Sequence, residues 1–72
     1  MNLFGNFIEV VGHKEDRVFS NQKILLNRDM VTLIATLDNG ILTLTLADGT
    51  IIMCEGTMDE LVELVSTSTI NN

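Results

Sequence analysis

The sequence contains almost none of the side chains on which most catalytic and metal sites depend. Cys54 is the only cysteine and His13 the only histidine among the 72 residues. A single cysteine excludes a disulfide within the chain, and one cysteine with one histidine cannot supply the ligands of a structural zinc site. Glycine-rich phosphate loops and calcium-loop motifs are missing too. We therefore predict a protein that is not an enzyme and that needs no metal and no cofactor.

Basic and aromatic side chains are scarce as well. Four lysines and arginines stand against ten acids, which gives a net charge of −6 at pH 7, and the chain has three Phe but no Trp or Tyr. Proteins that bind nucleic acids attract phosphates with basic patches and stack bases on aromatic rings. The composition therefore argues against nucleic-acid binding, although a few cations can bind a small anion locally.

Long hydrophobic runs are also lacking. A membrane-spanning helix needs about 18 or more consecutive apolar residues, and the chain has no such run. Its first residues lack the basic segment of a signal peptide, and a free cysteine is typical of a reducing compartment. These features predict a cytoplasmic protein that does not bind membranes.

Apolar residues, in contrast, are abundant. They make up 46% of the chain, and the mean hydropathy is +0.33. A chain of this length buries only about 60% of the surface that it exposes when unfolded. The surplus of apolar side chains predicts a surface that another chain covers, so we expect a homo-oligomer and a protein partner.

The stretch from residue 30 to residue 65 predicts three strands, two tight turns and one helix. Asn39-Gly40 and Asp48-Gly49 are typical of two-residue hairpin turns between strands of alternating polarity. Such turns would pair Leu37 with Leu42 and Leu46 with Ile51. Directly opposite residues share a face, so one apolar face would carry Leu33, Ala35, Leu37, Leu42, Leu44, Leu46, Ile51 and Met53.

The opposite face of this predicted sheet would mix threonines with isoleucines and Cys54. We expect the N-terminal strands, a second subunit or both to cover it. Cys54 is then a small core or interface residue, as free cysteines usually are. The apolar N-terminal residues pack either on another subunit or on their own sheet. The candidate interface residues are Leu3, Phe4, Phe7, Ile34, Ile41, Ile52 and Cys54.

The helix and the N-terminal strands complete the predicted fold. Thr57 and Glu60 form a capping box, and an apolar stripe follows at helical spacing, formed by Met58, Leu61, Val62 and Val65. Upstream, residues 7–11 and 18–27 predict strands, the second with a kink near Asn21. The fold class is therefore mainly β with one helix. We expect an antiparallel meander of about five strands and a short C-terminal helix packed on the Leu/Met face, in one domain over residues 1–66 with a tail at 67–72.

The most charged stretch, residues 12–17, predicts a loop. Two interpretations stay open for it: a solvated hairpin connection, or a loop that contacts an anion or a partner. The cationic side chains that could bind a small anion, for example around a pocket between subunits, are His13, Lys14, Arg17, Lys23 and Arg28.

From about residue 8 to residue 65 the chain resembles the FlbD-like family of small flagellar-operon proteins and similar uncharacterised small proteins of gut bacteria and phages. The residues that carry the resemblance are Leu26-Asn27, Val31-Thr32-Leu33-Ile34, Leu42-Thr43-Leu44-Thr45-Leu46, Asp48-Gly49, and Thr57 to Val65 with Asp59-Glu60. The lead-in, the long charged segment at 12–22 and one extra residue after Glu55 depart from the family pattern. The resemblance implies the strand order and a flagellar accessory role, and it implies no catalytic residues.

These observations predict a small, oligomeric, non-catalytic protein-interaction or assembly module. One alternative is a protein, encoded by a phage as a defence countermeasure, that sequesters a small ligand such as a nucleotide. The other is a flagellar accessory protein.

Overall fold

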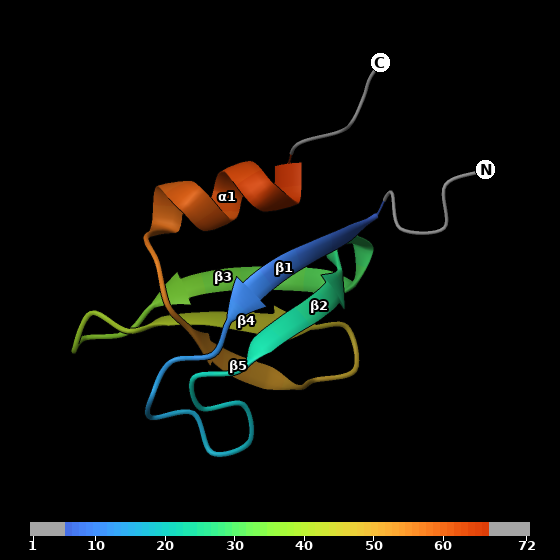
Figure 1. The fold of residues 1–72 in the computed structure, drawn as a ribbon. Helices are drawn as coiled ribbons and strands as arrows, with labels where there is room; N and C mark the ends of the chain where they lie inside the picture. The colour runs from blue at the N-terminus through green and yellow to red at the C-terminus, as the bar shows by residue number, and fades with distance from the viewer. Residues whose placement is uncertain (1–5, 67–72) are drawn as a thin grey trace.

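The structure, a computed structural model, describes residues 6–66. These residues form five antiparallel strands in two sheets and one C-terminal helix (Figure 1), which confirms the predicted fold class. Leu3, Phe4 and the tail at 67–72 lie outside the described residues. The elements are β1 (Phe7–Val11), β2 (Lys23–Asn27), the 3₁₀ helix η1 (Arg28–Met30), β3 (Val31–Thr36), β4 (Leu42–Leu46), β5 (Ile51–Cys54) and α1 (Met58–Ser66).

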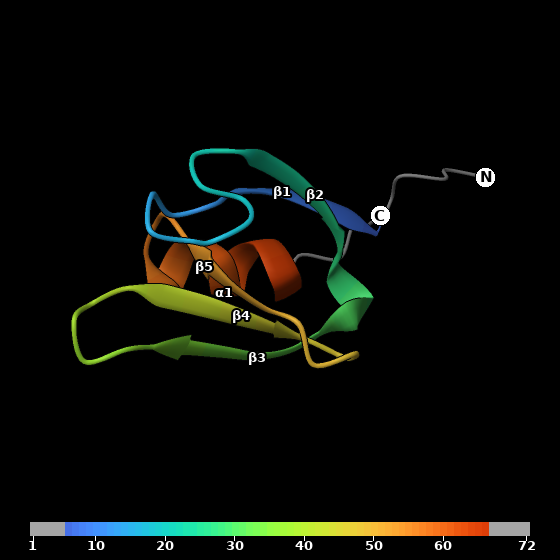
Figure 2. The same cartoon turned by 90° about the horizontal axis from the view of Figure 1, so that it is seen from below.

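A short junction joins the two sheets. β1 and β2 form a hairpin, and β3, β4 and β5 form a meander with β4 in the centre. Past the end of β1, the His13 N–H donates to the Met53 C=O (2.9 Å) and the Glu55 N–H donates to the Val11 C=O (2.8 Å). The hairpin therefore lies over one face of the meander, and α1 closes the side between the two sheets (Figure 2).

Both hairpin loops of the meander contain three residues, whereas the sequence predicted two. Residues 38–40 and 47–49 form these loops, and each ends on a glycine in the left-handed region, Gly40 (φ 89°) and Gly49 (φ 93°). A type I turn followed by such a glycine is a common three-residue hairpin. Asparagine and aspartate side chains stabilise the loops, because Asn39 accepts the Ile41 N–H and Asp48 accepts the Thr50 N–H.

The longer loops shift both registers by one residue, so the predicted core face is wrong for β3 and β5. Ile34 and Ile52 lie opposite Leu44, where Ala35 and Met53 were expected. A one-residue shift moves every side chain of a strand to the other face. The face against the hairpin therefore carries Val31, Ile34, Leu42, Leu44, Leu46, Ile52 and Cys54.

The core lies between this face, the hairpin and α1. Leu44, Ile52 and Cys54 are its most completely buried side chains. The hairpin contributes the inward-facing residues of its two strands, which are Ile8, Val10, Ile24 and Leu26. A bulge between Val31 and Leu33 allows both Val31 and Ile34 to contact this core.

Helix α1 begins as the sequence predicted. The Glu60 carboxylate accepts the Thr57 N–H (2.9 Å), and the Thr57 hydroxyl accepts the Glu60 N–H (3.2 Å). Leu61 is buried, and Met58 and Val65 pack against the core. Val62 was expected in the apolar stripe but is exposed, because α1 packs along β3 and η1 at the side of the sheet rather than across its face.

The charged loop at residues 12–22 is folded back on itself and tied to β5 by one buried carboxylate. Asp16 accepts the N–H groups of Phe19 (2.8 Å), Val18 (3.1 Å) and Met53 (2.9 Å). These hydrogen bonds, above all the one from the Met53 N–H, hold the pKa of Asp16 below its ordinary range. The predicted strand at 18–22 is wrong: these residues are a turn in which Asn21 adopts a positive φ of 59°.

We expect Asp16→Asn to lower the free energy of unfolding at pH 7 by about 2 kcal/mol. Asparagine keeps the shape, but its NH₂ group must face a backbone N–H that the second carboxylate oxygen now accepts. Chemical denaturation followed by circular dichroism measures the change, with the exposed Asp38→Asn as the matched control.

The stability difference between wild type and Asp16→Asn also depends on pH. Because the folded-state pKa of Asp16 is lowered, the difference is fully present above the unfolded-state pKa of about 3.9 and is lost as the pH falls through the folded-state pKa. Equal stability of the two proteins at pH 7 would contradict this role of Asp16.

Candidate functional site

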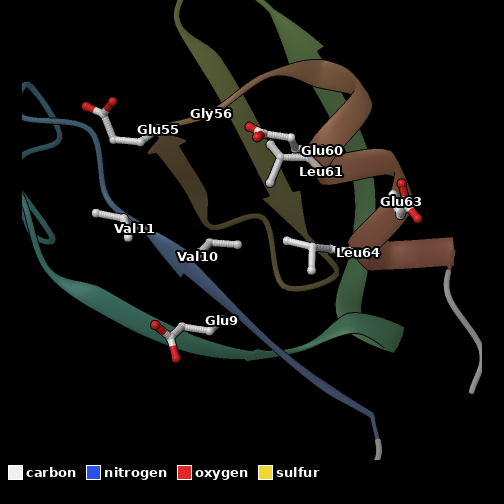
Figure 3. A pocket seen from close by; sticks show the side chains of 9 residues that line it. All are labelled: Glu9, Val10, Val11, Glu55, Gly56, Glu60, Leu61, Glu63 and Leu64. Atoms are coloured by element: carbon white, nitrogen blue, oxygen red, sulfur yellow. The ribbon is translucent and has the colours of Figure 1, made fainter.

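A groove of about 450 Å³ lies between β1 and α1 (Figure 3). It forms where the chain leaves β5, turns at Gly56 (φ 108°) and enters α1. A side chain at Gly56 would strain this turn, so the glycine sets the angle at which the helix departs. The lining residues are Glu9, Val10, Val11, Glu55, Gly56, Glu60, Leu61, Glu63 and Leu64.

The floor of the groove is apolar. Val10 and Leu61 are 4% and 2% exposed, and with Leu64 they point toward one another across the gap between β1 and α1 (Figure 3). Val11 and Leu64, each 37% exposed, lie nearer the solvent. Apolar side chains that remain exposed inside a concave site are typical of binding sites.

The rim of the groove is acidic. Glu9, Glu55, Glu60 and Glu63 line it and are exposed, and no lysine or arginine is among the lining residues. Glu60 also accepts the Thr57 N–H, and Glu55 lies 4.0 Å from the His13 Nε2. The rim therefore carries a concentrated negative charge around an apolar floor, which favours a cationic group over an anion.

One backbone edge of β1 also faces the groove. The Gly12 N–H donates to the Gln22 C=O on the β2 side, whereas the Val11 C=O accepts the Glu55 N–H on the other side. Alternate residues of an antiparallel strand direct their N–H and C=O groups to opposite edges. Glu9, two residues before Val11, therefore directs both groups away from β2 and toward the groove that it lines.

The predicted anion-binding residues lie at both ends of the hairpin. His13, Lys14 and Arg17 lie in the loop after β1, and Lys23 lies beside that loop, opposite Val11. Arg28 follows β2 at the other end of the hairpin, and its N–H donates to the Asn6 C=O. Arg17 lines a smaller hollow of about 330 Å³ beside β5. The other four residues line neither this hollow nor the groove.

Most of the predicted interface residues belong to the protein's own core. Ile52 and Cys54 are 2% exposed and Ile41 is 9% exposed, so their assignment to an interface is wrong. Ile34 is half-buried and packs against the same core. Of the covers expected for the face with Ile34, Ile52 and Cys54, the structure shows the N-terminal hairpin. Phe7 is partly exposed on β1.

Sequence reasoning missed the residues that form the groove. Leu64 lies three residues after Leu61, so the helical spacing already placed it beside the apolar stripe. The alternation of β1 likewise put Glu9 and Val11 on one face. The sequence could not predict that β1 lies beside α1, because this depends on where the backbone pairing between β1 and β5 ends.

No protein-family model matches the chain, and neither a curated protein nor a solved structure is significantly similar to it. The resemblance to the FlbD-like family therefore stays a prediction. Within residues 6–66, no helix combines the length and the apolar character that crossing a membrane requires. In the same range, no three His, Cys, Asp or Glu side chains come together as a metal site.

The only thiol is shielded, which bears on any nucleophilic role. Burial raises the pKa of Cys54 to about 11, and the charge of Asp16 adds to the effect. We expect the native protein to react with a disulfide reagent at pH 8 roughly 100-fold more slowly than the denatured protein, because the thiolate is the reactive species. Absorbance of the released thiol measures both rates, and equal rates would show that Cys54 is accessible.

Proposed function

We propose that the protein is a small, non-catalytic protein-interaction module and that the groove between β1 and α1 binds a segment of its partner. The observation that carries this proposal is the combination of an apolar floor, an acidic rim and an available strand edge in one groove. Side chains and backbone of a polypeptide can satisfy all three at once.

The same groove disfavours the alternative of a sequestered nucleotide. A phosphate would approach four carboxylates with no cation among the lining residues, and like charges repel strongly where solvent screening is reduced. The flagellar role remains a prediction of the resemblance alone.

Affinity capture with a matched pair of variants tests the groove. We expect proteins retained by the wild type to be retained by Leu25→Lys and lost with Leu64→Lys, because only Leu64 lies in the groove. Both changes replace a partly exposed leucine with lysine. Quantitative mass spectrometry of the captured proteins is the measurement. Capture that is lost with Leu25→Lys instead, or with neither variant, would overturn the assignment of the site.

The outer face of the β3–β4–β5 sheet supports the further proposal that two copies of the chain associate. Leu33, Thr45 and Ile51 form a row across this face, and Leu33 and Ile51 are 57% and 63% exposed. The next row consists of Ala35, Thr43 and Met53, so neither row carries a charge. Two chains with a net charge of −6 repel each other least where an uncharged apolar face meets its own copy.

We expect the wild type to have about twice the 8.0 kDa chain mass in solution and Leu33→Lys to be monomeric, because lysine would bury its charge between the two copies. Light scattering coupled to size-exclusion chromatography measures both masses. Leu25→Lys is the control, since Leu25 is equally exposed but lies in the other sheet. A wild type that is monomeric at micromolar concentration would refute the dimer.

A further inference from the structure

The edge of β1 that faces the groove has the geometry of an incomplete sheet. Pairing between the β1 side and the β5 side continues from His13 to Val11 and then stops, because the chain after Glu55 turns away into α1. Glu9 offers the next N–H and C=O pair on that edge. An extended segment at this position would continue the ladder at the usual strand spacing of about 4.8 Å.

We infer that the occupant of the groove is an extended segment that alternates apolar with lysine or arginine residues and adds to β1 as a further strand. This inference rests on the proposed function and names the class of partner. The alternation follows from strand geometry, because successive side chains of an added strand point to the same two faces as those of β1.

The inward face of the added strand meets apolar surface. Val10 points inward from β1, and Leu61 and Leu64 complete that wall from α1 (Figure 3). Every second residue of the segment is therefore apolar. Its remaining side chains lie on the outward face beside Glu9, and Glu55, Glu60 and Glu63 also line the groove. Lysine or arginine at these positions complements the negative charge of Glu9 and of the groove as a whole.

The other exposed strand edge of the hairpin does not offer this combination. β2 carries Lys23 at its start and is followed by Arg28, so a cationic strand would meet like charge there. No β2 residue lines the groove or the smaller hollow beside β5. Of the two edges of the hairpin, the inference therefore selects that of β1.

A synthetic heptapeptide that alternates lysine with valine tests the inference directly. Titration into the ¹⁵N-labelled full-length protein is followed by amide chemical shifts and by hydrogen exchange of the Glu9 amide. We expect shifts concentrated on Val10, Val11, Leu61 and Leu64, and exchange at Glu9 slowed by at least about tenfold at saturation. Raising the salt from about 50 mM to about 500 mM should weaken binding at least about tenfold.

Two control peptides and two variants separate charge from strand addition. The peptide with glutamate in place of lysine should not bind, and the peptide with proline as its central residue should bind at least about tenfold more weakly, because proline lacks the N–H. Glu9→Lys should weaken binding of the lysine peptide, whereas the matched Asp38→Lys, outside the groove, should not. Chemical-shift dispersion verifies that both variants are folded.

The outcomes distinguish this inference from the proposed function. Binding in the groove without protection of Glu9, and with equal affinity for the proline peptide, overturns strand addition while the groove remains a protein-binding site. Shifts on β2, or no binding of the lysine peptide, overturn the inference as a whole. The proposed function fails separately, when Leu64→Lys leaves the set of captured proteins unchanged.

Discussion

The short junction between the end of β1 and β5 is the constraint on which the rest of the structure depends. Two backbone hydrogen bonds, from His13 to Met53 and from Glu55 to Val11, join a hairpin and a meander that are each too small to bury a core alone. Asp16 reinforces the junction, because its carboxylate also accepts the Met53 N–H. These bonds fix where the edge of the hairpin meets β5, and the side chains of the core pack between the two sheets.

The same junction creates the groove by ending where it does. β5 is only four residues long, and the capping box at Thr57 starts the helix soon afterwards. The segment after Glu55 therefore turns away from the edge of β1 and continues as α1. The side chains of α1 contribute to the floor of the groove, but the backbone of a helix cannot pair with a strand. The open edge of β1 thus lies beside α1 because α1 follows directly after the short strand β5.

Acidic residues have two physically different roles in this chain. Asp16 is buried and bonded to three N–H groups, so its charge stabilises the fold. Asp48 likewise stabilises a turn, and its bonds to Thr50 lower its pKa. The four glutamates of the groove are exposed, and their shared position gives a local field. Glu60 combines both roles, because it also accepts the Thr57 N–H at the start of α1.

The elements of this fold could be predicted from short-range patterns, but their registers could not. Asn39-Gly40 and Asp48-Gly49 are compatible with loops of two or three residues. Both loops have three, so the two predicted registers agreed with each other while being wrong in the same direction. The apolar pattern could not reveal the error, because β3 and β5 have adjacent large apolar residues on opposite faces, Leu33-Ile34 in β3 and Ile51-Ile52 in β5.

The sequence by itself determined the strands, the two turns, the capped helix and the scarcity of catalytic and metal-binding side chains, because each depends on residues within a few positions of one another. Only the tertiary structure decided which side chains form the core and where the groove lies. The glutamates that line the groove lie far apart in the sequence, from Glu9 to Glu63. Long-range backbone bonds bring them together, and no local pattern encodes those bonds.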